Sequence, residues 1–315
     1  MSSRELVILG TASQVPTRTR NHNGYVLRWD GLTILFDPGE GTQRQLLLAG
    51  VSAASVDRIC LTHLHGDHSL GLPGVLARRA VDDAPGPAVL HFPAASLRDV
   101  RVLRHAGAPA GPVPAVEVPV ESDGVQARGL AGGSEWVLTA AALDHRIPAV
   151  GYRLEEPDGV TFRPERLVAL GISGPDVGRL SETGEIAIGN RVVLLDEVTQ
   201  PRRGQSVAVV MDTRVCAGAV EIARDVDVLL CESTYLDVDA DLAAAYGHLT
   251  ARQAAEIAVA AGARLLALTH FSRRYGDDVE QFAVEARRAV RAAGADLEVV
   301  AVRDLDRLAL PARRA

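Results

Sequence analysis

The sequence contains no lysine, and all 33 of its basic residues are arginines. Against 40 acidic residues they leave a formal net charge of −7. This balance argues against a protein that coats nucleic acid generally, because such proteins are usually basic. A coding sequence rich in G and C accounts for the missing lysine, since alanine and glycine are also abundant. The functional alternative is that any anion held here by a side-chain cation must meet a planar, permanently charged guanidinium.

Cysteine is scarce as well. Cys60, Cys216 and Cys231 form no CxxC pair, which argues against a disulfide framework and against a thiolate zinc site. The short, charged N-terminus is not typical of a signal peptide, and no apolar run approaches the length of a membrane span. We therefore expect a soluble, cytoplasmic protein, and 315 residues are enough for one large domain or two average ones.

Apolar runs separated by turn signals predict strands and helices. The Asp30-Gly31 pair predicts a hairpin between strands at 25–29 and 32–36, and Thr250 with Gln253 predicts the capping box of a helix that ends near Gly262. Further strands are expected at 6–9, 58–61, 137–143, 207–211, 226–230 and 265–268, and further helices at 41–49, around 75–79 and at 279–292. Stretches rich in proline, glycine and alanine predict loops at 82–95 and 106–114.

The amino-acid composition changes between Glu155 and Arg203. Prolines, glycines and charged residues dominate there, and apolar runs are short. This composition is typical either of a linker between two domains or of a long surface excursion from one domain.

The cluster His63-x-His65-x-Asp67-His68 is the sharpest feature of a chain that has only 9 histidines. Neutral imidazoles and carboxylates are the ligands that suit zinc and related cations. Side chains alternate along extended backbone, so His63 and His65 point the same way, and Asp67 and His68 lie beyond a bend where they can face a second ion. The alternative is a polar loop, but three histidines within six residues would be costly to keep for that purpose.

Three more candidates follow apolar strands, as His63 does: His145, Asp212 and His270. Each alone is more often structural, but polar groups at the carboxyl ends of strands in a layered α/β protein converge on one crevice. With the cluster they make seven ligands, which is too many for one tetrahedral zinc and about right for two. A pair of ions generates a nucleophile from water and stabilises both oxygens of an in-line displacement on phosphorus, so hydrolysis is the expected reaction class.

The motifs, taken in order, resemble those of the ribonuclease Z family within the metallo-β-lactamase superfamily. The resemblance runs from about residue 6 to about residue 305 and rests on Leu9-Gly10-Thr11, Pro16-Thr-Arg-Thr-Arg20-Asn21, the His63 cluster, Asp144-His145 with Gly151-Tyr152-Arg153, Asp212-Thr213-Arg214, Glu232-Ser-Thr-Tyr235 and Thr269-His270-Phe-Ser-Arg-Arg-Tyr275. It implies an α+β fold, a four-layer αββα sandwich, in one domain spanning 1–315. It also implies an endoribonuclease that cuts the 3′ trailer from precursor tRNA and leaves a 3′-hydroxyl on the tRNA.

The resemblance assigns roles to individual residues. Asp67 would take the proton from the attacking water, His248 would assist the leaving 3′ oxygen, and Glu232 would orient His248. A structural residue ahead of the Thr250 helix cap is the alternative for His248. His22, His91 and His105 match no motif, and we expect them to be structural or on the surface. Two zinc ions would share Asp212 as a bridge, with one held by His63, His65 and His145 and the other by Asp67, His68 and His270.

The stretch 155–191 resembles the exosite of the family, an arm that grips the elbow of tRNA, with Gly174 and Pro175 at its tip. This arm departs from the family pattern, because the tip lacks an additional proline and residues 151–203 hold seven arginines against nine acidic residues where lysines are usual. The resemblance further implies a homodimer in which the arm of one subunit serves the active site of the other. Phosphate contacts are expected near the site from Arg18, Arg20, Asn21, Arg273 and Arg274.

Two other functions remain open. A phosphodiesterase of the same superfamily could act on small or other RNA substrates, but a small ester needs neither the basic loop at 16–21 nor an arm. A non-catalytic RNA-binding protein could have kept the fold, but all seven ligand positions and His248 are present.

Overall fold

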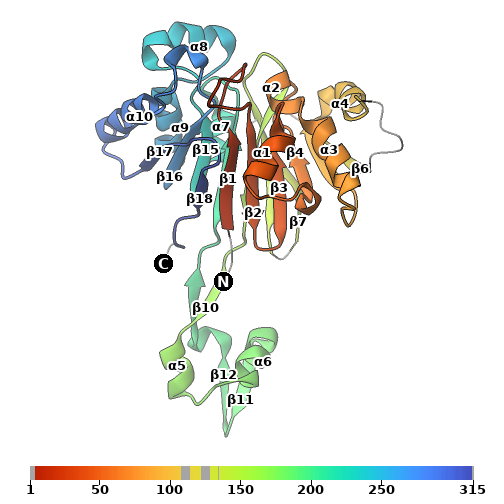
Figure 1. The fold of residues 1–315 in the computed structure, drawn as a ribbon. Helices are drawn as coiled ribbons and strands as arrows, with labels where there is room; N and C mark the ends of the chain where they lie inside the picture. The colour runs from red at the N-terminus through yellow and green to blue at the C-terminus, as the bar shows by residue number, and fades with distance from the viewer. Residues whose placement is uncertain (1–3, 108–113, 122–127, 134, 314–315) are drawn as a thin grey trace.

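The computed structural model describes residues 4–107, 114–121, 128–133 and 135–313. Two seven-stranded sheets face each other, and helices cover the outer face of each, so the layers run helix, sheet, sheet, helix (Figure 1). This is the four-layer αββα sandwich that the resemblance to the ribonuclease Z family implies. Within the described ranges, no helix is both long and apolar enough to cross a membrane.

The N-terminal sheet has the strand order β18-β1-β2-β3-β4-β5-β6. Strands β1, β2 and β3 pair antiparallel, whereas β3 to β6 pair parallel. Its strands are β1 (Arg4–Gly10), β2 (Gly24–Trp29), β3 (Leu32–Phe36), β4 (Arg58–Cys60), β5 (Ala88–Pro93), β6 (Ala115–Val120) and β18 (Arg307–Ala309). Its helices are α1 (Thr42–Leu48), α3 (Leu72–Val81) and α4 (Leu97–Arg104), with the short α2 (Gly66–Ser69) at the sheet edge.

The second sheet has the order β17-β16-β15-β14-β9-β8-β7. Strands β14 to β17 are parallel, and β14 is antiparallel to β9. Its strands are β7 (Arg128–Gly132), β8 (Val137–Leu143), β9 (Ala149–Glu155), β14 (Ser206–Val210), β15 (Val228–Glu232), β16 (Leu265–Thr269) and β17 (Glu298–Ala301). Helices α7 (Ala217–Ile222), α9 (Ala251–Ala261) and α10 (Glu280–Ala292) cover it, and α8 (Ala240–Tyr246) lies at its edge (Figure 1).

Strand β1 shows why several strands read as unbroken apolar runs. Leu6 and Ile8 belong to the core between the two sheets, while Val7 and Leu9 belong to the core under α1 and α3. Both faces of the strand are therefore buried, and no polar alternation is needed.

Two local predictions had different outcomes. The Asp30-Gly31 turn joins β2 to β3 with Trp29 opposite Leu32, and Asp30 adopts the positive φ (53°) that such a hairpin turn requires. The predicted loop at 82–95 is wrong, because it contains β5, which pairs with parallel strands on both sides. Prolines at the ends of this short buried strand mask it in the sequence. Of the predicted loop at 106–114, positions 108–113 lie outside the described residues.

The polar groups of interest lie at one edge of the sandwich. Strands β14, β15 and β16 are parallel, and β8 is antiparallel to β9, so the carboxyl ends of β8, β14, β15 and β16 meet at the same edge. The ends of β1, β3 and β4 share one edge of the other sheet. Helices α2 and α8 mark this end of the molecule (Figure 1).

A segment projects from the opposite end, where β9 finishes (Figure 1). Strands β10 (Gly159–Phe162) and β13 (Thr199–Arg202) form its stalk, beyond which lie α5 (Pro164–Ala169), α6 (Pro175–Thr183), β11 (Glu185–Ile188) and β12 (Arg191–Leu194). The segment has its own small core, formed by Ile172, Leu180, Val193 and Val198. It is inserted between two neighbouring strands, β9 and β14, so it is an excursion rather than a linker.

The projection lies within 155–203, where the composition changes, and its bounds differ from the stretch 155–191 that the resemblance gives for the exosite. Glu155 still belongs to β9 and pairs with Ser206 of β14. The projection ends at Arg202, because the returning strand β13 must pair with β10. We call residues 159–202 the arm.

One carboxylate, that of Glu156, ties the base of the arm to both ends of the chain. It accepts hydrogen bonds from Arg4 of β1 (2.6 Å), Arg202 of β13 (2.8 Å) and Arg313 near the C-terminus. Burial alone would raise the pKa of Glu156, but Arg4 and Arg313 outweigh it and lower the pKa to about 2. The carboxylate thus holds together three guanidiniums from three distant segments.

Replacing Glu156→Gln should lower the free energy of unfolding by about 2 kcal/mol, because three clustered guanidiniums lose the carboxylate that they share and, among the described residues, only Arg4 keeps another, Asp30. Glu155→Gln is the matched control, since Glu155 is more exposed and Arg153 is its one ion-pair partner within the described ranges, and it should cost less than about 1 kcal/mol. Denaturant unfolding measures both. Because the pKa of Glu156 is depressed in the folded chain, the difference should be full above the unfolded value of about 4.3 and fade as the pH falls towards 2. Equal losses in the two variants would contradict this role.

Candidate active site

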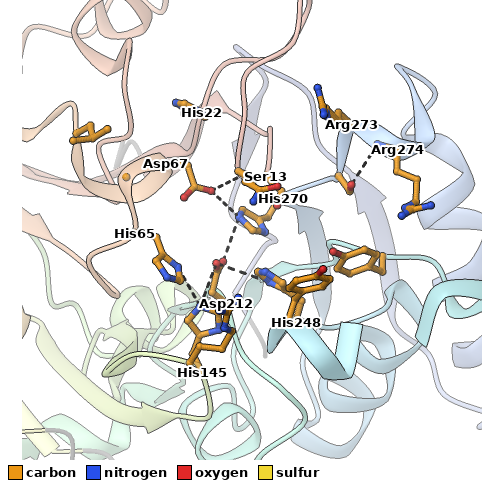
Figure 2. Close-up of a pocket in the computed structure, with 17 residues that line it drawn as sticks. Ser13, His22, His65, Asp67, His145, Asp212, His248, His270, Arg273 and Arg274 are labelled. Atoms are coloured by element: carbon orange, nitrogen blue, oxygen red, sulfur yellow. Dashed lines mark hydrogen bonds and ion pairs between the residues drawn. The ribbon is translucent and has the colours of Figure 1, made fainter. Parts of the chain in front are cut away.

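A pocket of about 780 Å³ opens at the edge where the strands end. Three of the four strand ends that were singled out in the sequence contribute to its lining, through His145, Asp212 and His270 (Figure 2). His65 and Asp67 line it from the cluster after β4, while His63 and His68 are fully buried behind them. The structure therefore brings all seven predicted ligand residues to one place.

Strained backbone aims several of these side chains. Asp37 after β3, Asp212 after β14 and His270 after β16 have positive φ values of 46°, 46° and 62°. Aspartate and histidine tolerate this left-handed region better than most residues, but it is costly and is typical of functional sites. The sharp turns at Asp212 and His270 direct these side chains into the pocket, whereas Asp37 stays buried behind it against His68.

Three imidazoles meet in the first cluster of donor atoms. Nδ1 of His65 lies 3.1 Å from Nε2 of His63 and 3.2 Å from Nε2 of His145. Oδ2 of Asp212 is 3.4 Å from Nε2 of His63 and 3.9 Å from Nε2 of His145. Four donor atoms thus surround one point.

The second cluster uses the other oxygen of the same carboxylate. Oδ1 of Asp212 lies 3.3 Å from Nε2 of His68 and 3.3 Å from Nε2 of His270, which are 3.2 Å apart. Oδ2 of Asp67 is 3.4 Å from Nε2 of His270 and 3.5 Å from Nε2 of His68. Oδ1 of Asp212 is buried and accepts no hydrogen bond from the described residues. A carboxylate oxygen without a donor, among imidazole nitrogens, fits a bound cation.

A second layer of contacts fixes the imidazoles so that the opposite nitrogen faces the clusters. Asp37, which sequence reasoning missed, lies 2.9 Å from Nδ1 of His68 and accepts from the Thr62 amide and hydroxyl. The available signal was its place directly after the apolar run 32–36. The other three contacts are Thr62 Oγ1 with His63 Nδ1 (3.0 Å), the Gly247 carbonyl with His145 Nδ1 (2.8 Å) and Thr234 Oγ1 with His270 Nδ1 (2.6 Å).

Burial and charge set the protonation of the rings. Burial lowers the pKa of His65 and of His145 to about 4, so both rings are neutral and offer a lone pair at neutral pH. Burial acts the same way on His68, but Asp212 and Asp67 outweigh it and raise its pKa. The carboxylates that favour a proton there would equally favour a metal cation.

His248 lies beside the second cluster, on the segment between α8 and α9. Its Nδ1 is 3.1 Å from Oε1 of the fully buried Glu232 (Figure 2 shows the ring in the pocket wall). Burial alone would lower the pKa of His248, but Glu232 and Asp212 outweigh it and raise the pKa to about 9. Glu232 is itself fixed by the amide of Thr213 (2.9 Å) and the hydroxyl of Thr234 (2.6 Å).

The predicted phosphate-binding residues are placed in different ways. Arg273 and Arg274 line the pocket on the side away from His65 (Figure 2). Arg18 is exposed outside the pocket lining, and Asn21 donates to the carbonyls of His22 and Glu40. The structure does not bring the Arg20 guanidinium into the pocket, because it is buried and donates to the Gly276 carbonyl (2.6 Å), which ties the loop at 16–21 to the rim loop.

The predicted arm-tip residues, Gly174 and Pro175, are exposed where α6 begins and lie on the arm, away from the pocket. His91 and His105 also lie outside the pocket lining, in keeping with the sequence analysis. His22 differs, because it is buried and lines the pocket near Asp67 (Figure 2).

Backbone around Asp67 completes the wall of the pocket. The Gln14 amide donates to Oδ2 of Asp67 (2.7 Å), and Gln14 has a positive φ of 63°. A Cβ on Gly39 would lie 2.2 Å from the carbonyl oxygen of Asp67 and 2.7 Å from Cβ of His22, so only glycine fits between them. Gln14 therefore holds the carboxylate of Asp67, while Gly39 and His22 pack beside its backbone.

Comparison with known proteins decides the family. A model of the metallo-beta-lactamase superfamily matches residues 17–181. A protein named Ribonuclease Z from Streptomyces coelicolor is 54% identical over the full length of both chains, and one from Kineococcus radiotolerans is 51% identical over all of this chain and 98% of its own. The chain belongs to the ribonuclease Z family. The crystal structure of the short form of human tRNase Z shares its fold, with a TM-score of 0.67, 24% identity and coverage of 98% of this chain and 100% of the human one.

The ribonuclease Z family consists of endoribonucleases, and its metallo-β-lactamase fold implies a divalent metal. The two clusters described above supply groups of three or four donor atoms that all lie within 4.8 Å of one another. Their chemistry, imidazole nitrogen and carboxylate oxygen, suits such a metal. Because the chain belongs to this family, the pocket is a candidate metal centre as well as a candidate active site.

Gly247 offers a test of this centre. It has φ +79°, and an added Cβ would lie 2.9 Å from Nδ1 of His145, the atom that its carbonyl holds. Gly247→Ala should displace His145 and weaken metal binding by about 10- to 100-fold, as loss of an outer-layer contact typically does. Competition with a chelator measures the affinity.

Gly184→Ala is the matched control, because Gly184 has φ +80° but no atom within 4 Å of an added Cβ. It imposes the same backbone strain without touching an imidazole. If the two variants bound metal equally well, the contact between Gly247 and His145 would not matter for the centre.

Proposed function

We propose that this chain is a zinc-dependent endoribonuclease that removes the 3′ trailer from precursor tRNA and leaves a 3′-hydroxyl on the tRNA. The observation that carries the proposal is the pair of donor clusters that share the Asp212 carboxylate. Relatives named Ribonuclease Z at about half identity over the full chain support RNA as the substrate, and the tRNase Z fold neighbours support tRNA.

Two zinc ions would fill the clusters. Ligand atoms around a tetrahedral zinc at 2.0–2.1 Å are about 3.3 Å apart, which agrees with most separations in both clusters. Bound ions would lower the pKa of water and neutralise charge on the phosphate. His63, His65 and His145 would hold one zinc, Asp67, His68 and His270 the other, and Asp212 would bridge them.

The residues around the clusters would carry the proton transfers. Asp67 takes a proton from the water whose oxygen attacks phosphorus, and its carboxylate is held in place by the Gln14 amide. The bond from phosphorus to the 3′ oxygen breaks, and His248 donates a proton to that oxygen. Glu232, on the other ring nitrogen of His248, keeps the ring oriented and its pKa high.

Arginines at the rim would hold the RNA backbone. Arg273 and Arg274 line the pocket and can each bind a phosphate through two N–H groups. Arg18 lies on the neighbouring loop, which Arg20 and Thr19 fasten to Gly276 and Asp277. Arg20 would then act by positioning this loop rather than by touching phosphate.

The arm supports a dimeric assembly. The arm leaves the sandwich at the carboxyl end of β9. The pocket lies at the carboxyl ends of β8 and β14, which both run antiparallel to β9. Arm and pocket of one chain therefore lie at opposite ends (Figure 1). In a homodimer the arm of a second copy, with its tip at Gly174 and Pro175, would grip the tRNA whose 3′ end enters this pocket. A cytoplasmic location would bring such an enzyme to its tRNA and suits its three unpaired cysteines.

The decisive experiment offers the zinc-loaded protein a precursor tRNA and bis-p-nitrophenyl phosphate. We expect cleavage of the RNA at one position, with a 3′-hydroxyl on the tRNA fragment when the ends are mapped. Cleavage of the small ester alone would replace the proposal with a small-substrate phosphodiesterase. No cleavage of either would favour a binding protein.

The role of the arm can be tested without disturbing the sandwich. Phe162 and Thr199 are paired across the stalk, so residues 163–198 can be replaced by Asn-Gly to give a two-residue hairpin. The replacement removes the core of the arm almost whole. Cleavage of precursor tRNA should fall at least tenfold, with hydrolysis of bis-p-nitrophenyl phosphate retained. Equal losses on both substrates would argue against an RNA-gripping arm.

A further inference from the structure

Tyr246 stands apart from the other aromatic residues. Of the described phenylalanine, tyrosine and tryptophan side chains it is the most exposed, at 49%, and it lines the pocket rim. Two of the five tyrosines, Tyr25 and Tyr152, are fully buried. About half of this ring remains in water at the mouth of a polar pocket, and amphipathic rings of this kind are enriched at binding sites.

The backbone that carries Tyr246 is rigidly joined to the reaction centre. Arg214 donates to the Ala244 carbonyl (2.9 Å), and the His248 amide donates to the Ala243 carbonyl (2.8 Å), which together close the end of α8. The next residue, Gly247, accepts the hydrogen bond from Nδ1 of His145. Tyr246 is thus one residue from the group that orients His145 and two residues from His248.

Arg146 accompanies the ring. Its guanidinium carbon lies 6.0 Å from the centre of the Tyr246 ring, within the range of a cation–π contact. It is exposed, lines the same pocket and forms no ion pair or side-chain hydrogen bond with any described residue. An aromatic face beside a free guanidinium is the combination that binds single-stranded nucleic acid, where the ring stacks on a base and the cation meets the backbone.

We propose that Tyr246 and Arg146 form a stacking subsite for the base of the nucleotide whose 3′ oxygen leaves. This inference rests on the proposed function and adds to its phosphate contacts a contact with a base. His248 marks the side of the pocket where that oxygen departs, and the ring of Tyr246 is carried by the same segment two residues earlier. Stacking accepts every base, so the subsite would place the unpaired 3′ end of many tRNAs without reading their sequence.

Substitution of the ring tests the subsite. Tyr246→Ala should lower kcat/KM for precursor tRNA about ten- to a hundredfold, the usual loss when a base loses its aromatic platform. Tyr246→Phe keeps the ring and should restore most of that loss. Val238→Ala is the matched control, because Val238 is an 85% exposed apolar residue just before α8 and lies outside the pocket lining, and it should change nothing. A Tyr246→Ala enzyme as active as the wild type would overturn the proposal.

A modified substrate shows whether the ring meets this particular base. A precursor tRNA that lacks the base at the cleavage nucleotide should be cut more slowly by the wild type. The Tyr246→Ala enzyme should lose no further activity on it, because the stack is already gone. If removal of the base slowed both enzymes by the same factor, the ring would contact something else.

A binding measurement separates this inference from the proposed function. A product tRNA that ends in 2-aminopurine should lose fluorescence when it binds the wild type and keep it with Tyr246→Ala. If wild-type protein did not cut precursor tRNA but the signal still fell, the proposed function would be wrong and the stack retained. If it cut the RNA and the signal did not fall, the stack alone would be wrong. No binding would overturn both.

Discussion

The buried carboxylate of Asp212 is the group on which the centre of this molecule depends. It is 2% exposed, and five imidazole rings lie between 3.3 and 3.9 Å from its oxygens. A buried charge is tolerated only when opposite charge lies beside it, so this carboxylate favours a cation among the rings, whether a divalent metal or a protonated imidazole such as that of His248. The strained backbone of Asp212 holds this carboxylate where the edges of the two sheets meet, and each ring in turn depends on an outer contact such as Asp37 or the Gly247 carbonyl.

The direction of the strands places the pocket and the arm at opposite ends of the molecule. Parallel strands β14 to β16 bring their carboxyl ends, with Asp212, Glu232 and His270, to one edge. The antiparallel β9 ends at the opposite edge and releases the arm there. A chain with this topology cannot fold its own arm back to its own pocket by a short path. A substrate that contacts both the arm and the pocket must therefore be long or must bridge two copies of the chain.

Sequence patterns predicted the parts that depend on local order. Residues close together in the sequence determine the hairpin at Asp30, the capping box at Thr250 and the polar residues at strand ends. The parts that were missed depend on distant segments. The buried place of Arg20 is set by a carbonyl 256 residues away, and the orientation of His145 by a carbonyl 102 residues away. His22 has no motif of its own and acquires its place in the pocket only because Gly39 lets the backbone of Asp67 approach. Pairwise tertiary contacts of this kind leave no periodic trace in the sequence.

The absence of lysine and the net charge of −7 do not exclude RNA binding at the pocket, as the partners of the arginines show. Many guanidiniums are engaged by protein groups: Arg4 and Arg202 by Glu156, Arg20 by Gly276 and Arg214 by Ala244. Arg146 and Arg273 line the pocket and have no acidic partner among the described residues. These two guanidiniums are available to attract RNA at the mouth of the pocket, while the net negative charge of the chain opposes weak binding to the surface as a whole. A planar guanidinium also stacks on a ring, which an ammonium cannot do, so an arginine-only chain can combine phosphate and base recognition at a single rim.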